Sequence, residues 1–553
     1  MFKDYTMNQV ILPLDLEYKL DENDIAYVIN NLIEEMPDQA FDGFKRDTGC
    51  PSYHPRMMMK IILCSYTQSV FSGRKIEGLL KDSVRMMWLS QGYEPSYRTI
   101  NRFRVHPEVK ELLRQCFVQF RCQLVEEKQI DEEAIFIDGT KIEANANKFT
   151  FVWRKSIENY SNNLIKKSNE MYDELLEKEI IPEIERESSE ELSVKELEII
   201  LKNIDDKVEQ YNHAIEMSDE VSERKELRSI RKEPKQYQKK VQDFLTRKQK
   251  YQEDMIIFND RNSYSKTDQD ATFMRMKDDY MGNGQLKPAY NVQVATEGQY
   301  ALAYEVFPNP GDTRTLIPFL TQIENNFFSL PQYIVADAGY GSEQNYDYIL
   351  NQSKRIPLIT YNQYRKEQKK KFKNDPLKVN NWEYNKEEDI FVCPNGKTMY
   401  FSHTSTRTDK YGFLHTYKVY ENEDCSDCPL RSNCTKAKPG VNRKIYYNET
   451  WEEQKAYTRE VLSNESTEKI YKKRKIDVEP VFGFLKANLR FIRLSVRSKE
   501  KVENELGFAF MAVNLRKYTA LNNTYPLTKK QNQQKTDFNY QSSIIEISFL
   551  IFS

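Results

Sequence analysis

A glycine-free, highly charged segment divides the chain and constrains every fold that it can adopt. Residues 155 to 254 contain 44 charged residues among 100 and no glycine, and apolar residues recur at helical spacing in "LSVKELEIILKNI". This pattern predicts one or two long exposed helices, in the form of a hairpin with coiled-coil character. A solvated spacer is the alternative. Because strand-like sequence lies on both sides, one β-sheet must be assembled from segments that this insertion separates.

The remaining sequence predicts several structural units around one α/β core. A chain of 553 residues is too long for a single core. Apolar residues at three- and four-residue intervals predict helices before residue 130, and strand-like runs follow. The predicted units are a helical N-terminal domain (1–130), the first part of the α/β core (131–154 and 255–365), the charged helical insertion (155–254), a Cys-rich insertion (366–465), the C-terminal helices of the core (466–522) and a flexible tail (523–553).

Strand-like runs in the core come first as a meander and then alternate with helices. "KPAYNVQVATEGQYALAYEVFP" holds two strands joined by the turn "TEGQ", whereas "YIVADAG" and "IPLIT" flank the helical pattern "SEQNYDYILNQ". A meander followed by strand–helix alternation is typical of a mixed sheet covered by helices. The sequence therefore predicts the α/β class.

Two of the predicted strands end on an aspartate followed by flexible backbone. Asp138 follows the strand in "IFIDGT", and Asp337 follows the strand in "IVADAGYG". In an open α/β sheet the C-terminal strand ends face the ligand crevice. Carboxylates placed there can share hard divalent cations such as Mg²⁺ or Mn²⁺. Two such ions can activate the attacking oxygen and stabilise the leaving oxygen of a phosphodiester.

A third acid lies in a basic helical segment near the C-terminus. Between residues 469 and 499, ten Lys or Arg stand against two acids. Such a surplus attracts phosphate, although a solvated helix face is the alternative. Because proline disfavours helix at the residue before it, Pro480 predicts a kink, or a helix that begins near Glu479. At 100° per residue, three lysines lie within about 40° of Glu479 around the helix: Lys472, Lys475 and Lys486.

The segments "IDGTKIEANANK", "VADAGYGSEQN" and "YKKRKIDVEPVFGFLK" resemble the catalytic blocks of the DDE transposases of bacterial insertion sequences. The resemblance extends from about residue 50 to 518 and implies an RNase H-like fold with Asp138, Asp337 and Glu479 as the metal-binding triad. It implies two Mg²⁺ or Mn²⁺ ions, double-stranded DNA (element ends and target) as the partner, and a homodimer assembled on DNA. It also implies that residues of the last block hold DNA: Tyr471, Lys472, Arg474, Lys475, Lys486 and Arg490.

The last block departs from the family's best-known pattern at one point. Four residues separate Arg474 from Glu479, where the family pattern has three, so the role of Lys486 is better defined than that of Arg474. Other acids lie in or near the same segments, and we interpret each as a surface or supporting residue: Glu143, Asp312 and Asp477.

A short helix in the N-terminal region carries three arginines. Ser96 is expected to cap a helix that begins with "YRTINRFR". Arg98, Arg102 and Arg104 then fall on its turns, where a DNA-reading helix places basic side chains. An ordinary helical bundle with basic surface residues is the alternative.

Four of the eight cysteines lie within 42 residues. Cys393, Cys425, Cys428 and Cys434 could supply four thiolates to a tetrahedral structural Zn²⁺, and glycine, proline and serine around them allow the necessary turns. His403 and His415 are substitute ligands. Four reduced thiols in a loop-rich insertion are the alternative.

The expected function is metal-dependent DNA transposition: cleavage at the ends of an insertion sequence, then joining of the 3′-hydroxyl to target DNA. An RNase H-like nuclease without strand transfer and a catalytically inactive, transposase-derived DNA-binding protein are the alternatives. We find no run of about 18 uncharged apolar residues, and the first 20 residues carry charges where a signal peptide needs an apolar core. A cytoplasmic, nucleoid-associated protein without a membrane partner is therefore expected.

Overall fold

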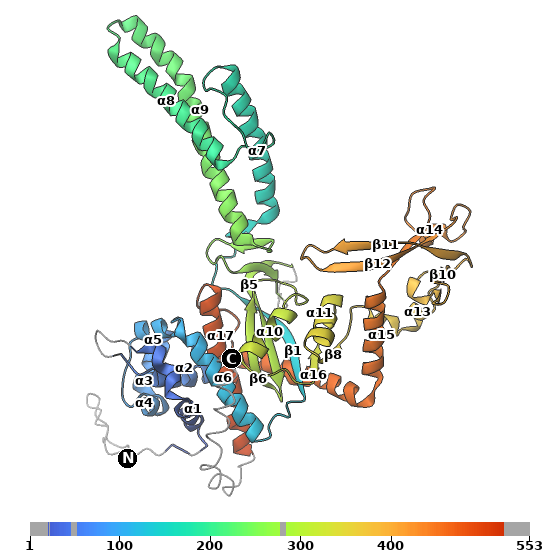
Figure 1. Cartoon of the computed structure of the whole chain (residues 1–553). Coiled ribbons are helices and arrows are strands. Elements are labelled where there is room, and N and C mark those ends of the chain that lie inside the picture. Colours follow the sequence, from blue (N-terminus) through green and yellow to red (C-terminus); the bar gives the residue numbers. More distant parts are fainter. Residues whose placement is uncertain (1–19, 22, 46–51, 277–283, 525–553) are drawn as a thin grey trace, which may run out of the picture.

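The computed structural model describes residues 20–21, 23–45, 52–276 and 284–524. Figure 1 shows a central sheet with a cluster of N-terminal helices beside it, a long helical arm above it and a second, smaller sheet. Of the tail predicted for residues 523–553, only the last two residues of helix α17 (Lys499–Thr524) belong to the described part.

The N-terminal region is helical, as predicted. Ser96 begins α5 by accepting a hydrogen bond from Thr99 N, which confirms the predicted cap. The helices of this region are α1 (Ile25–Glu34), a 3₁₀ turn (Asp38–Phe44), α2 (Pro55–Thr67), α3 (Gly73–Asp82), α4 (Val84–Ser90), α5 (Tyr97–Arg104) and α6 (Glu108–Glu126).

The central sheet is mixed, as the strand pattern predicted. Its order is β4-β5-β1-β7-β8, and β6 also pairs with β5. β1 is antiparallel to β5 and parallel to β7, which is in turn parallel to β8. The strands are β1 (Ala134–Glu143), β4 (Thr272–Arg275), β5 (Leu286–Glu297), β6 (Tyr300–Phe307), β7 (Tyr333–Ala336) and β8 (Ile356–Ile359).

Helices cover both faces of this sheet because successive strand residues point to opposite sides. On one face, Ile135 and Ile334 join a core that includes α10 (Leu316–Asn326) and α17. On the other face, Phe136 and Val335 pack with residues of α15 (Glu449–Ser463) and α16 (Glu465–Gly483).

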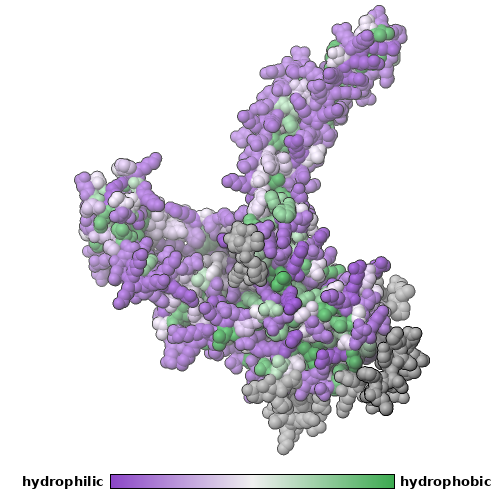
Figure 2. All heavy atoms as spheres, turned by 180° about the vertical axis from the view of Figure 1, so that it is seen from behind, coloured by the Kyte–Doolittle hydropathy of each residue, from purple (hydrophilic) through white to green (hydrophobic). Residues whose placement is uncertain are grey.

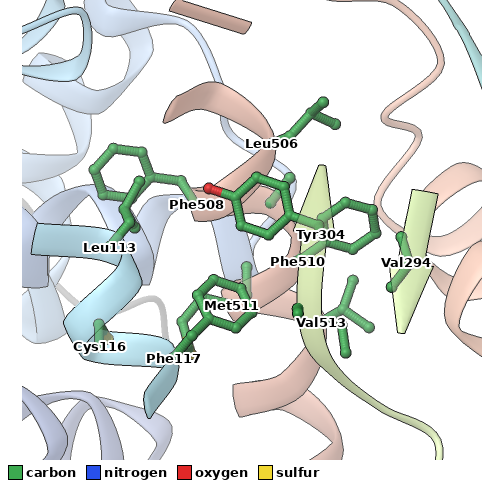
Figure 3. Close-up of a cluster of buried hydrophobic side chains, with 14 of the residues drawn as sticks. Leu113, Cys116, Phe117, Val294, Tyr304, Leu506, Phe508, Phe510, Met511 and Val513 are labelled. Atoms are coloured by element: carbon green, nitrogen blue, oxygen red, sulfur yellow. The ribbon is translucent and has the colours of Figure 1, made fainter. Parts of the chain in front are cut away.

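Helix α17 joins the N-terminal helices to the sheet. It packs against α2 and α6 as well as β6. Figure 3 shows Leu113 and Phe117 of α6 beside Tyr304 of β6 and Phe508 of α17 in one apolar cluster. The first and last described helices therefore share a core although they lie far apart in the sequence.

The charged insertion forms an arm of three helices, whereas the sequence predicted one or two. α7 (Arg154–Glu177) and α8 (Val194–Met217) both pack against the long helix α9 (Val221–Phe258), and their apolar faces form a separate small core. At its base, β2 (Phe151–Trp153) pairs with β3 (Ser263–Ser265). Figure 2 shows a mostly hydrophilic arm surface, as expected for a solvated projection.

The Cys-rich region contains an antiparallel sheet that the sequence reading missed. Its order is β13-β12-β11-β10-β9. Short helices (α12 Tyr364–Glu367, α13 Lys370–Lys373, α14 Arg431–Cys434) accompany it. The strands are β9 (Glu383–Asn385), β10 (Ile390–Val392), β11 (Thr398–Thr408), β12 (Leu414–Asn422) and β13 (Lys444–Tyr447).

Candidate functional site

The two strand-end aspartates lie on neighbouring parallel strands. Phe136 of β1 pairs with Val335 of β7. Two residues further along, β1 reaches Asp138 and the chain after β7 reaches Asp337. This register therefore brings Asp138 and Asp337 to adjacent positions at one edge of the sheet.

Local contacts orient both carboxylates. Asp138 Oδ1 accepts a hydrogen bond from Gly139 N at 2.8 Å, and its Oδ2 lies 3.5 Å from Nη1 of Arg474 on α16. Asp337 Oδ1 accepts one from Gly339 N at 2.7 Å. The side chains of Asp138 and Arg474 are only 16% and 12% exposed. A guanidinium therefore balances part of the negative charge beside Asp138.

A buried phenol and a buried amide lie near the two aspartates. Tyr340 is fully buried and donates a hydrogen bond to Gln293 Oε1 on β5. Burial raises the pKa of Tyr340, and the negative charges of Asp312, Asp138 and Asp337 raise it further. All three carboxylates thus act on one phenol. The sequence patterns did not identify Gln293 or Tyr340 as functional residues. For Gln293, the alternation of polar and apolar residues in "YNVQV" was a signal that could have found it.

Glu479 lies on α16 with an exposed side chain. Arg474, five residues earlier, reaches Asp138, and five residues turn a helix by about 140°. Glu479 therefore points to a different side of α16 from Arg474. Across the described ranges, no three His, Cys, Asp or Glu side chains form a group that could hold a metal ion.

Helix α16 continues through Pro480, so the predicted helix start near Glu479 is wrong. A π-helical turn at Phe484–Asn488 follows the helix. The proline leaves the Ile476 carbonyl without its helical donor, and Gln299 Nε2 donates to this oxygen at 2.9 Å. A donor from the β5–β6 turn therefore compensates for the proline inside the helix.

Two of the competing acids have structural partners. Asp477 is buried and accepts hydrogen bonds from Thr296 Oγ1 at 2.6 Å and from the backbone of the β5–β6 turn. Burial raises the pKa of Asp477, whereas these hydrogen bonds lower it. Glu143 lies 3.2 Å from Lys287 Nζ and 3.8 Å from Arg493 Nε. The structure thus supports the interpretation of both as supporting residues.

The basic residues of the last block fall into two groups. Lys472 and Lys475 are exposed on the same face of α16 as Glu479. Lys486 instead lies in the π-helical turn and donates to Lys141 O of β1 at 3.3 Å, so it does not continue that face. Arg490 is exposed, and the Tyr471 hydroxyl is 3.2 Å from Thr360 Oγ1.

The three arginines of α5 occupy different environments. Arg98 and Arg102 are exposed. Arg104 is only 7% exposed, and its guanidinium donates hydrogen bonds to Tyr66 Oη and to Phe71 O. Arg104 therefore holds α5 against α2 and the chain that follows it, and only Arg98 and Arg102 present their charge to solvent.

The four clustered cysteines line one small cavity of about 20 Å³. Burial raises the pKa of the Cys434 thiol, and the charges of Cys393, Cys428 and Cys425 raise it further, whereas Arg443 lowers it. Of the substitute ligands, His415 places its Nδ1 2.6 Å from Oε2 of Glu343, the first residue of α11 (Glu343–Asp347). His403 lies on β11.

Comparisons with known proteins find transposase sequences in both halves of the chain. A family model described as "Transposase DDE domain" matches residues 392–519, and one described as "Transposase domain (DUF772)" matches residues 14–106. The type II restriction enzyme CeqI of Rhodococcus hoagii is 33% identical over 93 residues, which are 17% of this chain and 34% of that enzyme. The chain thus spans about a third of the length of this relative. No solved structure matches the chain.

The two family matches indicate a transposase, and the mixed α/β fold fits a DDE domain broadly. Together, the two family matches support a DDE-type transposase of insertion sequences. Within the part of the chain that the structure describes, no helix is both long and apolar enough to cross a membrane.

Proposed function

We propose that this transposase cleaves DNA at the ends of an insertion sequence and joins the released 3′-hydroxyl to target DNA. One observation carries the proposal: the β1–β7 register brings Asp138 and Asp337 to adjacent positions at one edge of the sheet. The DDE-domain match supports the same chemistry from an independent direction.

We infer that the central sheet is RNase H-like and that the chain divides as the sequence predicted. Three antiparallel strands (β6, β5 and β1) followed by two parallel ones (β7 and β8) support this inference. In such a sheet the catalytic carboxylates come from strands that are neighbours in space, although the helical arm separates them in sequence.

The proposed site suits a hard divalent cation. Mg²⁺ is commonly held by one or two carboxylates together with substrate phosphates, so Asp138 and Asp337 supply a sufficient first set of oxygen ligands. Glu479 is the proposed third ligand and would have to approach from α16. When bound, Mg²⁺ or Mn²⁺ ions supply charge stabilisation to the attacking and leaving oxygens of a phosphodiester.

The residues around the aspartates would hold the substrate. Lys472 and Lys475 offer exposed ammonium groups for DNA phosphates, and Arg490 extends this basic surface. Exposed Arg98 and Arg102 would contact DNA from the N-terminal helices. Because two element ends must be joined, we propose that a homodimer assembles on DNA.

A nuclease without strand transfer is the second candidate function. The 33% identity over 93 residues to a protein named a type II restriction enzyme favours it. Both functions would use the same carboxylates and the same metal ions, so the products distinguish them. Joined strands indicate transposition, and cut strands alone indicate a nuclease.

The experiment combines the purified full chain with DNA that carries element ends, target DNA and Mg²⁺ or Mn²⁺, and maps cut and joined strands. Asp337→Asn should lower both products at least about 100-fold, because it removes a metal-binding carboxylate. Its binding of end DNA should stay within about twofold. Asp347→Asn is the matched control, since Asp347 accepts a local hydrogen bond from Asn351, four residues later in the chain. Full activity of Asp337→Asn would contradict the proposed site.

We also propose that Cys393, Cys425, Cys428 and Cys434 hold a structural Zn²⁺. Their common cavity and their thiol chemistry support this, since zinc prefers four sulfur or nitrogen ligands. The ion would fix the turn regions beside β11 and β12 and would have no part in the reaction.

A further inference from the structure

A cavity of about 770 Å³ lies between the N-terminal helices and the chain that leads into α17. Its walls come from the chain before α3 and the first turn of this helix, from α5, and from Ser495 and Val496. All of these residues fall within the two transposase matches, at 14–106 and 392–519. The cavity therefore forms where the two matched parts of the chain meet.

Among the described residues, the charged side chains that line this cavity are all cationic. They belong to Lys75 of α3 and to Arg102 and Arg104 of α5. Lys75 and Arg102 are exposed, whereas Arg104 is only 7% exposed. The nearby Glu505 accepts a hydrogen bond from Ser495 N at 2.8 Å, but it is buried and does not line the cavity. A wall with this surplus of positive charge attracts an anion.

The first turn of α3 adds backbone donors to the same wall. Ser72 and Gly73 begin the helix and line the cavity, and the Ser72 side chain makes no capping hydrogen bond. The first N–H groups of a helix have no acceptor inside the helix and carry partial positive charge, so they bind anions. A Cβ on Gly73 would overlap Asn101 Oδ1, so the glycine allows α5 to approach this turn.

Arg104 supplies a second and independent sign of a ligand. Its Nη1 donates hydrogen bonds to Tyr66 Oη and Phe71 O, and its Nη2 donates to Asn101 Oδ1 at 2.7 Å. Within the described ranges its buried Nε has no hydrogen-bond partner. A buried donor without an acceptor costs free energy, and an anion in the cavity would lower this cost for a cationic group.

We propose that this cavity binds one phosphate group, held by the N–H groups at the start of α3 and by the side chains of Lys75 and Arg102. Phosphate suits the site because its oxygens can accept hydrogen bonds from backbone donors and from cations at the same time. The phosphate belongs to the backbone of DNA, an assignment that rests on the proposed function. It would hold the duplex at the junction of the N-terminal helices and the core without reading its sequence.

The test measures binding of the full chain to a short fluorescent duplex of arbitrary sequence, by anisotropy over a series of KCl concentrations. A double variant that combines Lys75→Met and Arg102→Met should bind about tenfold more weakly, and the slope of log K against log salt should fall in magnitude by about 0.9, the value for one phosphate contact. Lys81→Met, in the last turn of α3, is the matched control and should keep both the affinity and the slope.

Ser72→Asp separates binding from folding. Aspartate is a favourable residue at the start of a helix, and its charge suits the helix N-terminus, so the melting temperature should stay the same or rise. The same charge repels a phosphate at the same N–H groups, so the duplex should bind at least about tenfold more weakly. If the melting temperature of Ser72→Asp falls instead, the double variant alone decides.

The outcomes separate this inference from the proposed function. If the variants bind the duplex with the affinity and slope of the unchanged chain, the inference is wrong and the proposed function stands. A fall in slope of about 1.8 in the double variant also contradicts the inference, because Lys75 and Arg102 would then hold two separate phosphates. Variants that bind the duplex normally but lose inorganic phosphate, measured by calorimetry, overturn the assignment to DNA. If the unchanged chain does not bind the duplex, the proposed function itself is wrong.

Discussion

Arg104 and Arg102 lie two residues apart on α5, but replacing each by methionine should affect different properties of the protein. Arg104 donates to Tyr66 Oη at 2.9 Å, to Phe71 O at 2.7 Å and to Asn101 Oδ1 at 2.7 Å. In Arg104→Met the apolar stem remains, but these three acceptors lose a charged donor. We therefore expect Arg104→Met to destabilise the N-terminal helices, and Arg102→Met to weaken DNA binding.

The expected loss in the free energy of unfolding of Arg104→Met follows from these hydrogen bonds. Each bond to a charged group contributes about 1.5–3 kcal/mol, and their sum is an upper limit because contributions within one network are not additive. Each acceptor left without its donor costs about 1–3 kcal/mol, so for Arg104→Met we expect a loss of about 3 kcal/mol or more. Arg102 is exposed, so Arg102→Met should change the free energy of unfolding by less than about 0.5 kcal/mol.

Hydrogen exchange measured by mass spectrometry is the suitable assay, because a chain with several units does not unfold in one step. A loss of about 3 kcal/mol corresponds to a decrease in amide protection of at least about 100-fold in α2 and α5. Binding of end DNA, measured as a function of salt, provides the second readout. Unchanged protection in Arg104→Met, together with the same loss of DNA affinity as in Arg102→Met, would refute the structural role of Arg104.

Three further predictions concern pH, backbone space and zinc. Burial raises the pKa of Glu297 from its ordinary value of 4.5 to about 7. Between these two pH values the folded chain binds more protons than the unfolded chain, so the free energy of unfolding should fall as pH rises from 4.5 to about 7. Glu297→Gln should flatten this decline, measured as the melting temperature against pH. In Gly341→Ala the new methyl group would meet Thr360 O and Tyr361 Cα, so the melting temperature should fall with a cost of about 1–3 kcal/mol; an unchanged value would contradict the close contact. Elemental analysis should find about one Zn²⁺ per chain and less in Cys428→Ser, whereas a zinc-free chain would contradict the zinc site.

Local sequence patterns predicted helices and strands well where helical periodicity or a strand run with a turn was clear. Periodicity predicted the helices of the N-terminal region, and strand runs with a turn predicted β5 and β6. The Cys-rich sheet was missed because its strands carry many exposed polar residues, so no clear alternation marks them. Pro480 was read as a helix boundary, but a donor from Gln299, nearly two hundred residues earlier in the chain, satisfies the freed carbonyl.

The sequence by itself determined the fold class and the two aspartates at strand ends, because hydrophobic periodicity and strand-end carboxylates are local features. Only the tertiary structure decided which residues surround them. Asp312 lies against β5 because Asn291 and Gln293 supply two buried amides, and Arg104 turns inward because Tyr66 and Phe71 accept its hydrogen bonds. The environment of a charged side chain depends on partners that are distant in sequence, and no pattern along the chain records them.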